Sequence, residues 1–172
     1  MITYILGAPG SGKTSIIPRL RELLPDRVVL DWDAFMDPAG ELAGAPIRQT
    51  PQTWGPYGRL LRAVGEAILP VDLVLLGVCT PDELADWPSG RWILLDCTDD
   101  VRRKRLVRRG TPDDIEDALT DAGNYRALDL PTVDSTDLTP AEVARAVVRV
   151  MGRSGTPTGS GTFRDGAGDN LE

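Results

Sequence analysis

Residues 7–14 read Gly7-Ala8-Pro9-Gly10-Ser11-Gly12-Lys13-Thr14, which matches the Walker A pattern. The apolar run Ile2–Leu6 precedes this stretch, and a helix-compatible run over residues 16–24 follows it. Strand, glycine-rich loop and helix in this order are the context that the motif requires. The loop amides and the helix N-terminus would then form a cradle for phosphate. The stretch therefore predicts binding of a nucleoside triphosphate, the alternative being a glycine-rich turn that fits the pattern by chance.

The motif also predicts a role for its individual residues. Lys13 is expected to reach the β- and γ-phosphates of ATP, and the Thr14 hydroxyl is expected to hold Mg²⁺. Glycines allow the backbone to wrap tightly, so that successive amides point inward. The predicted ATP-binding residues of this segment are Gly7, Pro9, Gly10, Ser11, Gly12, Lys13, Thr14 and Ser15.

Length and charge narrow the class of protein. A chain of 172 residues is most simply one domain with a well-buried core. The formal net charge is −7, whereas general nucleic-acid binders are usually basic, so nucleic acid is not an expected partner. The chain contains no histidine, which excludes histidine-based catalysis and metal ligation. We expect a monomer or homodimer that acts on a small molecule.

Cysteine usage and hydropathy indicate the compartment. Cys79 and Cys97 lie in apolar runs without CxxC spacing, which is typical of small core residues in a reducing environment. No stretch is long and apolar enough to span a membrane. Because Met1 leads directly into the first predicted strand, we expect no signal peptide and a cytoplasmic location.

Predicted strands alternate with predicted helices along the chain, which indicates an α/β fold with a mainly parallel sheet. A long irregular connection is expected over residues 37–51, where glycine and proline are frequent. A short helix is expected near residues 82–86. The predicted domain covers residues 1–151, and residues 152–172 are expected to be a disordered tail because they are almost devoid of apolar side chains. The other predicted strands cover residues 2–6, 27–30, 73–78, 92–95 and 132–134, and the other predicted helices cover residues 13–24, 53–69, 99–109, 112–128 and 140–151.

Two carboxylates follow the second predicted strand. In an open α/β sheet, ligands bind outside the carboxyl ends of the strands. The third strand carries no acid at that end, so the usual Walker B acid is missing. Asp31 and Asp33 follow the second strand at the correct end. We favour Asp33 as the base that accepts the acceptor's proton and Asp31 as the Mg²⁺ partner. The alternative is a helix cap, since a short helix can start at Ala34.

Arginines are concentrated in residues 102–109. On a helix, Arg102, Arg105 and Arg109 lie three and four residues apart and share a face. Guanidinium groups suit the charge that spreads over a phosphoryl group during transfer, and an arginine-bearing lid over residues 102–115 would exclude water. The alternative is a solvated basic helix facing the acids that follow it.

Aromatic and basic residues flank the long connection, in a region of about residues 36–57 that we expect to bind the acceptor. Such a site needs an aromatic face for stacking and guanidinium groups for an acid or phosphate. The alternative, which we weight equally, is that the arginines lie on an exposed helix face and the aromatic residues pack in the core. The candidate substrate-binding residues are Arg48, Trp54, Tyr57, Arg59 and Arg62.

Several of these motifs resemble those of a known group of enzymes. Residues 7–14 resemble the loop of adenylate-kinase-like nucleoside monophosphate kinases. Asp31-Trp32-Asp33 resembles the Asp-x-Asp of shikimate kinases and a similarly placed Asp of chloramphenicol phosphotransferase. Residues 94–97 followed by 102–109 look like the fourth strand and lid-bearing helix of small P-loop kinases. Residues 133–136 resemble the loop that closes over adenine in those kinases.

The resemblance implies a three-layer P-loop NTPase fold with a five-stranded sheet in the order 2-3-1-4-5. It also implies ATP with Mg²⁺ as donor and a hydroxyl or phosphate as acceptor. By this resemblance Arg105 stacks on adenine, Arg109 is a lid arginine and Asp31 or Asp33 meets the acceptor. The chain departs from adenylate kinases because Leu76-Gly77 replaces their Asp-Gly and no long lid domain is present.

The resulting hypothesis is a kinase that transfers the γ-phosphoryl of ATP to a nucleoside, a nucleotide, or another hydroxyl-bearing metabolite or antibiotic. A nucleotide-binding switch or accessory ATPase without a small-molecule acceptor is the main alternative, because the third-strand acid is missing. A kinase acting on nucleic-acid ends is a third hypothesis, which the acidic composition disfavours.

Overall fold

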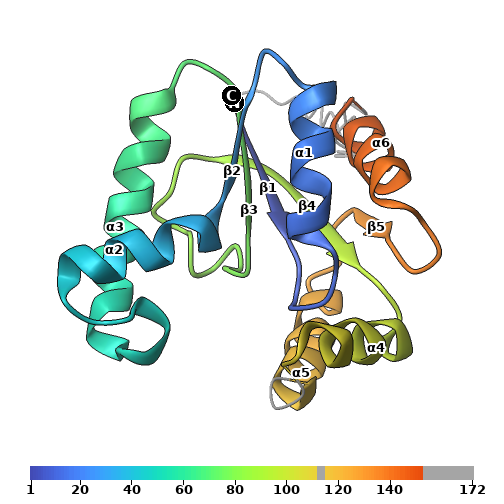
Figure 1. The fold of residues 1–172 in the computed structure, drawn as a ribbon. Coiled ribbons are helices and arrows are strands. Elements are labelled where there is room, and N and C mark those ends of the chain that lie inside the picture. The colour runs from blue at the N-terminus through green and yellow to red at the C-terminus, as the bar shows by residue number, and fades with distance from the viewer. Residues whose placement is uncertain (112–114, 153–172) are drawn as a thin grey trace, which may run out of the picture.

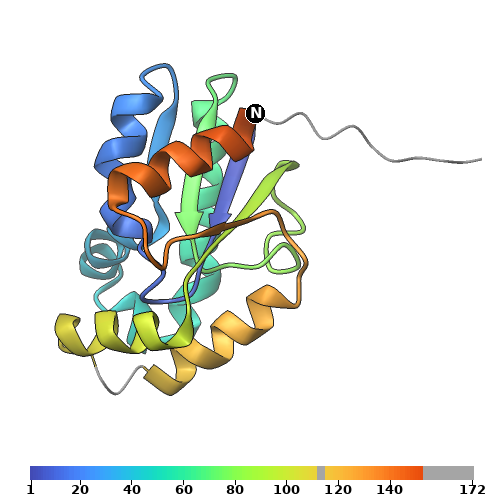
Figure 2. The same cartoon turned by 90° about the vertical axis from the view of Figure 1, so that its right-hand side faces the viewer.

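The computed structural model describes residues 1–111 and 115–152, which form an α/β fold in three layers (Figures 1 and 2). The strands form one parallel sheet in the order β2-β3-β1-β4-β5. The predicted fold class and strand order are therefore confirmed. The strands are β1 (Ile2–Leu6), β2 (Val28–Asp31), β3 (Leu73–Gly77), β4 (Gly90–Asp96) and β5 (Thr132–Asp134).

Helices cover both faces of the sheet (Figure 1). The helices α1 (Lys13–Leu23) and α6 (Pro140–Gly152) pack on one face, against side chains such as Ile5 and Leu95. The helices α3 (Pro51–Ile68) and α5 (Ile115–Arg126) pack on the other face, where the alternate positions point. Both faces are apolar because a parallel sheet is covered on both sides.

Local sequence sets several helix ends. At the start of α6, the Glu142 carboxylate accepts hydrogen bonds from the amide and hydroxyl of Thr139 at 2.9 and 2.6 Å, while the Glu142 amide donates to the Thr139 hydroxyl at 3.4 Å. This reciprocal arrangement is a capping box, with Pro140 in the first helical position as predicted. The helix α4 (Asp99–Arg109) ends at Gly110.

The segment between β2 and α3 is more regular than predicted, so the expected irregular connection over residues 37–51 is wrong. It contains η1 (Trp32–Phe35), α2 (Met36–Ala43) and η2 (Ile47–Gln49), and α3 begins at Pro51. Some of the breakers stand at helix ends, as Gly44 does at the end of α2 with a φ of 69°, whereas Pro38 and Gly40 lie within α2 without preventing the helix. The short helix predicted near residues 82–86 is a series of turns.

The remaining sequence predictions concern the cysteines, the membrane and the tail. Both cysteines are free thiols, Cys97 buried and Cys79 partly so. None of the described helices is both long enough and apolar enough to cross a membrane. The predicted tail beyond Gly152 and residues 112–114 of the predicted lid lie outside the described residues.

The parallel sheet brings one end of every strand to the same edge. The loop with the Walker A motif follows β1 there, η1 follows β2 and α4 comes two residues after β4. Figure 1 shows α2 and α4 on opposite sides of this edge. Segments that are 20 to 90 residues apart in the chain therefore meet at one place.

Candidate active site

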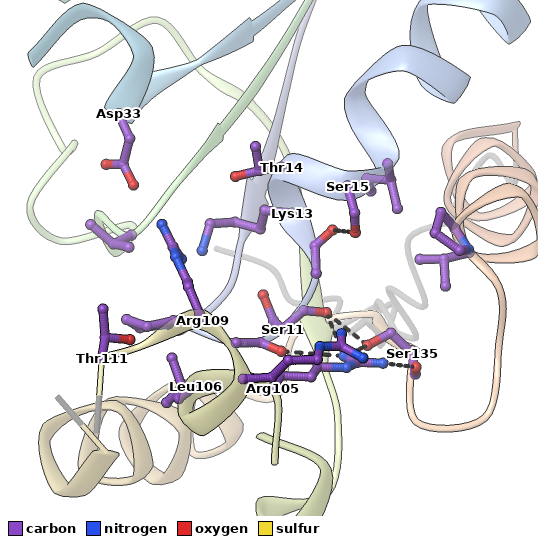
Figure 3. A pocket seen from close by; sticks show the side chains of 18 of the residues that line it. Ser11, Lys13, Thr14, Ser15, Asp33, Arg105, Leu106, Arg109, Thr111 and Ser135 are labelled. Carbon is purple, nitrogen blue, oxygen red and sulfur yellow. Dashed lines mark hydrogen bonds between the residues drawn. The ribbon is translucent and has the colours of Figure 1, made fainter. Parts of the chain in front are cut away.

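A cavity of about 920 Å³ opens at this edge (Figure 3). One side consists of residues 7–15, α4 and the turn that contains Ser135; we call it the P-loop side. The opposite side carries Asp33 and Arg48, which belong to η1 and η2, and we call it the η1–η2 side. The cavity is lined by most of the predicted site residues, namely Pro9, Gly10, Ser11, Gly12, Lys13, Thr14, Ser15, Asp33, Arg48, Arg105 and Arg109.

The glycine-rich loop has the geometry of an anion cradle. Gly12 has a φ of 101°, a conformation that strains any residue with a side chain. A Cβ on Gly7 would come within 2.7 Å of the Leu95 carbonyl oxygen, so the loop lies tightly against β4. Within the part of the chain that the structure describes, the amides of Gly10, Gly12 and Lys13 donate no hydrogen bond. Free amides at a helix N-terminus favour phosphate.

Lys13 lies in the loop with only a small part of its surface exposed. Its ammonium group donates to the carbonyl oxygen of Gly7 and, at 3.5 Å, to that of Ala8. Burial lowers the pKa of Lys13 to about 8, against the opposing effect of the nearby Asp33 and Asp31 carboxylates. The fold therefore destabilises the charged ammonium, and an anion in the cavity would stabilise it.

Thr14 and Asp31 lie together, as the predicted metal pair requires. The Thr14 hydroxyl is 3.4 Å from Asp31 Oδ2, and Asp31 is buried at the end of β2. The other carboxylate oxygen accepts the Asp33 amide at 3.1 Å, so Asp31 also caps η1. Asp31 is therefore both the helix cap that we considered as an alternative and a close neighbour of Thr14. A hydroxyl and a carboxylate are oxygen donors of the type that Mg²⁺ prefers.

Trp32 covers the end of β3, and Leu76, which stands where the acid would be, is fully buried in the core. A Cβ on Gly77 would come within 3.2 Å of Trp32 Cβ, because the Trp32 ring packs directly over this position. Gly77 also accepts the Gly7 amide through its carbonyl oxygen at 3.2 Å. Asp31 pairs with Leu76 in the neighbouring strand, so its carboxylate lies beside the position that the missing acid would have occupied.

Asp33 faces the cavity from the η1–η2 side. Its Oδ2 pairs with Arg48 Nη2 at 2.9 Å, and its Oδ1 is buried without a hydrogen-bond partner among the described residues. Figure 3 shows Asp33 and Arg109 directed toward the region of Lys13. Asp33 lines the cavity and its side chain is 32% exposed, so a group bound there can reach the carboxylate only through the Oδ2 that pairs with Arg48.

Arg102 lies behind the loop and not in the cavity. Its side chain is 0% exposed; Nη1 donates to the Pro9 carbonyl oxygen at 2.6 Å and Nη2 to Asp96. Arg126 of α5 binds the same carboxylate at 2.6 Å and the Asp99 carboxylate at 2.8 Å. This network connects β4, α4 and α5 to the loop. The shared helix face predicted for Arg102, Arg105 and Arg109 does not give all three access to the cavity, because Arg102 is too deep.

Arg105 and Arg109 do line the cavity, but they differ in their contacts. Arg105 donates to the Ser135 hydroxyl at 2.9 Å, to the Ser135 carbonyl oxygen at 2.7 Å and to two loop carbonyl oxygens at 3.2 and 3.3 Å (Figure 3). Arg109 is exposed and has no hydrogen bond or ion pair within residues 1–111 and 115–152. Arg109 is therefore free to bind an anion.

Four of the predicted substrate-binding residues do not line the cavity. Tyr57 is buried, its hydroxyl donates to the Trp32 carbonyl oxygen and its ring meets the Trp32 ring edge-on. For Tyr57 the structure supports the core-packing alternative. Arg62 pairs with Glu66 one turn along α3, while Trp54 and Arg59 are exposed on the same helix.

Asp96, Ser135 and Arg108 lie in segments that the sequence indicated, but none of the three was predicted as a site residue, and Arg126 lies outside those segments. Ser135 follows β5 at the carboxyl edge, so the strand-end rule applied to Asp31 would have found it. Arg126 binds Asp96 across 30 residues, and no local pattern in the sequence indicates that pairing.

Comparisons with known proteins place this geometry in a family. Residues 4–126 match the AAA_18 family, described as an AAA domain. No curated protein matches the chain. The described fold is similar to that of a Deinococcus radiodurans tunicamycin resistance protein, with a TM-score of 0.64, 21% identity and coverage of 89% of this chain and 96% of that chain.

Two similar solved structures are named as kinases. Shikimate kinase from Acinetobacter baumannii, in complex with shikimate, has a TM-score of 0.56 at 20% identity, with 87% of this chain and 92% of that chain covered. A gluconokinase from Sinorhizobium meliloti 1021 has a TM-score of 0.55 at 21% identity, with 86% and 91% covered. At this level of identity the likeness concerns the fold, and the predicted resemblance to the adenylate- and shikimate-kinase-like group is confirmed for the fold. The chain therefore belongs to the AAA domain family AAA_18 and has the fold of the small P-loop kinases.

Proposed function

We propose that the chain is an ATP-dependent kinase that transfers the γ-phosphoryl of ATP to a hydroxyl of a small molecule. One observation carries this proposal: a single cavity contains the phosphate cradle and, on its opposite side, a carboxylate that the cradle does not use. A protein that only binds nucleotide has no need for Asp33 there. The kinase names of two similar structures support the same activity.

The residues of the site have separate roles in phosphoryl transfer. The free loop amides and the Lys13 ammonium bind the phosphates. Thr14 and Asp31 would hold Mg²⁺, which offsets the charge of the β- and γ-phosphates when it is bound. Arg109 stabilises the charge on the transferred group, since it is a free guanidinium in the cavity. The domain limits, residues 1–151, and the cytoplasmic location stay predictions.

Asp33 orients the acceptor hydroxyl and takes its proton. The hydroxyl oxygen forms the new bond to the γ-phosphorus, the bond to the bridging oxygen breaks, and ADP leaves with that electron pair. Little covalent chemistry is left to the protein, so its contribution is mainly positioning and electrostatic stabilisation.

The test is a transfer assay with γ-labelled ATP, Mg²⁺ and a panel of hydroxyl-bearing small molecules. We expect label on at least one acceptor. The Asp33→Asn variant should lower kcat about 100-fold, the effect of losing a general base, and leave ATP affinity within about twofold. Asp37→Asn is the matched control, because Asp37 is exposed on the neighbouring α2 and does not line the cavity.

Other outcomes would contradict the proposal. Tight ATP binding without transfer to any acceptor would favour the nucleotide-binding switch, the alternative that the absence of an acid at the end of β3 supports. Equal losses of ATP affinity and of kcat in Asp33→Asn would remove the role of Asp33 as base.

A further inference from the structure

Arg102 lies directly behind the phosphate-binding loop, and the proposed mechanism gives it no role. Its Nη1 donates to the Pro9 carbonyl oxygen at 2.6 Å, and its Nη2 donates to the Asp96 carboxylate. Its stem also supports the loop, because a Cβ on Gly10 would come within 3.0 Å of Arg102 Cγ. The Asp96 carboxylate is itself held by Arg126 Nε at 2.6 Å. The guanidinium group is therefore fixed between the loop and an anchored carboxylate.

Folding stability alone does not account for an arginine at this position. The side chain of Arg102 has no exposed surface. The desolvation cost of a buried ion pair often equals or exceeds its attraction, so apolar side chains of similar volume can stabilise a core equally well. The Nε of Arg102 is also buried and has no hydrogen-bond partner within the described part of the chain. The contact with the loop therefore calls for a second explanation.

The contact with Pro9 fixes the direction of the next amide. The Pro9–Gly10 peptide bond is trans, and in a trans peptide group the C=O and the N–H point in opposite directions. Pro9 and Gly10 line the cavity whereas Arg102 does not, so the Pro9 oxygen is held on the side away from the cavity. The Gly10 amide, which donates to no described residue, is therefore directed toward the cavity.

The same arrangement recurs two residues further along the loop. The Ser11 carbonyl oxygen accepts hydrogen bonds from Arg105 Nη1 at 3.3 Å and from the Ser135 hydroxyl at 2.7 Å. The Gly12 amide belongs to the same peptide group and likewise has no partner among residues 1–111 and 115–152. The free amides of Gly10 and Gly12 thus each share a peptide group with a carbonyl that an arginine of α4 holds.

We propose that Arg102 is a positioning residue for phosphate binding, which holds the Pro9–Gly10 peptide group so that the Gly10 amide faces the phosphates. Arg102 acts through the Pro9 carbonyl and touches no ligand. An amide that is already oriented loses little entropy when the anion binds. The inference rests on the part of the proposed function that assigns the loop to the phosphates of ATP, and it does not depend on phosphoryl transfer.

The experiment measures phosphate binding apart from binding of the nucleoside. Calorimetry compares ATP with tripolyphosphate, which has no base or sugar, at the same Mg²⁺ concentration. Arg102→Met should weaken the affinity for ATP about 10- to 100-fold, as expected for loss of one hydrogen bond to a charged group. The affinity for tripolyphosphate should fall by the same factor, because the change concerns only the part of the site that binds phosphate.

A conservative variant keeps the test valid if Arg102→Met does not fold. Arg102→Lys retains a positive charge beside Asp96, but it lacks the planar fork that binds Asp96 and Pro9 together. Its affinity for both probes should lie between those of the wild type and Arg102→Met, about three- to tenfold below the wild type.

Two controls separate positioning from stability and from charge. Leu73→Ala empties a core position that is 1% exposed, at the end of β3 opposite the loop, so it should lower the melting temperature and leave both affinities within about twofold. Arg103→Met removes the neighbouring arginine of α4, which pairs with Glu116 at the surface, and should also change both affinities less than about twofold.

The outcomes separate this inference from the proposed function. Wild-type affinities in Arg102→Lys and Arg102→Met would overturn the inference and leave the kinase proposal standing. An equal loss of affinity in Leu73→Ala would also overturn it, because the loss would then follow stability. A larger loss for ATP than for tripolyphosphate would overturn it as well, since the nucleoside part of the site would be affected. A wild-type protein that binds neither probe would overturn the proposed function and the inference together.

Discussion

The two sides of the cavity are built in opposite ways. On the P-loop side, a fully buried arginine, Arg102, holds the loop from behind, and Arg105 ties it to the turn at Ser135. On the η1–η2 side, the polar contact at the cavity surface is the exposed pair of Asp33 and Arg48. Buried, connected contacts keep one geometry, whereas exposed single contacts rearrange at low cost.

This difference matches the two ligands that we propose. ATP presents the same phosphates in every turnover, so a cradle that is already in its binding conformation loses little entropy on binding. The acceptor of the proposed reaction would enter at the η1–η2 side, where the exposed pair of Asp33 and Arg48 can rearrange around it at low cost. Substitutions on the two sides test this contrast, and the largest change is expected on the P-loop side.

The largest effect is expected from Arg102→Met. The substitution leaves the Pro9 carbonyl oxygen and part of the Asp96 carboxylate without the buried partner, which should cost about 3–5 kcal/mol of unfolding free energy. The melting temperature should fall by roughly 10 °C. Arg103→Met, which breaks an exposed pair with Glu116, should change it little. Similar melting temperatures for the two variants would show that the P-loop side does not depend on its buried arginine.

Lys13→Ala should remove most of the activity without unfolding the protein. Loss of a positioned cation at the phosphates should reduce kcat/KM for ATP about 100-fold or more. Stability should not fall, because burial lowers the pKa of Lys13 to about 8 and the charged ammonium is unfavourable in the fold. Calorimetry with ATP and a thermal melt measure the two quantities. The exposed Lys104, changed to alanine, is the control. Unaltered ATP affinity in Lys13→Ala would remove the cradle from the mechanism.

Tyr57→Phe tests how the η1–η2 side is held. The Tyr57 hydroxyl donates to the Trp32 carbonyl oxygen at the start of η1, so its loss should cost about 1 kcal/mol and raise the acceptor KM several-fold, with ATP affinity unchanged. Tyr125→Phe removes an equivalent hydroxyl, which donates to the Val78 carbonyl oxygen at 2.6 Å. It should cost a similar amount of stability and leave the acceptor KM alone. If Tyr57→Phe and Tyr125→Phe changed the acceptor KM equally, the effect of the Tyr57 hydroxyl on the η1–η2 side would not be specific.

The smallest effect concerns the helix that borders the P-loop side. Thr139→Ala removes the capping box of α6 and should cost about 1 kcal/mol in a denaturant melt. Thr80 and Glu83 make the same set of contacts in front of a series of turns. Thr80→Ala should cost less than half as much, because no helix follows it. Equal losses of stability in Thr139→Ala and Thr80→Ala would indicate that the stabilisation comes from the hydroxyl contacts themselves and not from capping a helix.

Local sequence predicted the P-loop side better than the η1–η2 side. The Walker A motif specifies its own conformation, since Gly12 must adopt a positive φ and Lys13 starts a helix. Residues 37–51 gave no such signal. Their glycines and prolines suggested irregularity, but Gly44, Pro46 and Pro51 stand at or next to helix ends, and α2 accommodates Pro38 and Gly40 within it.

Local patterns were enough to predict the cradle, the parallel sheet and the edge at which Asp31 and Asp33 meet the loop. These follow from short-range patterns and from the rule that parallel strands end together. Which arginines face the cavity depends instead on contacts between distant parts of the chain. Arg102 and Arg105 share a helix face, yet one is buried under Pro9 while the other lines the cavity, because depth depends on what packs against the helix. The pairing of Arg48 with Asp33 likewise requires η1, α2 and η2 to fold back on one another, which no local pattern specifies.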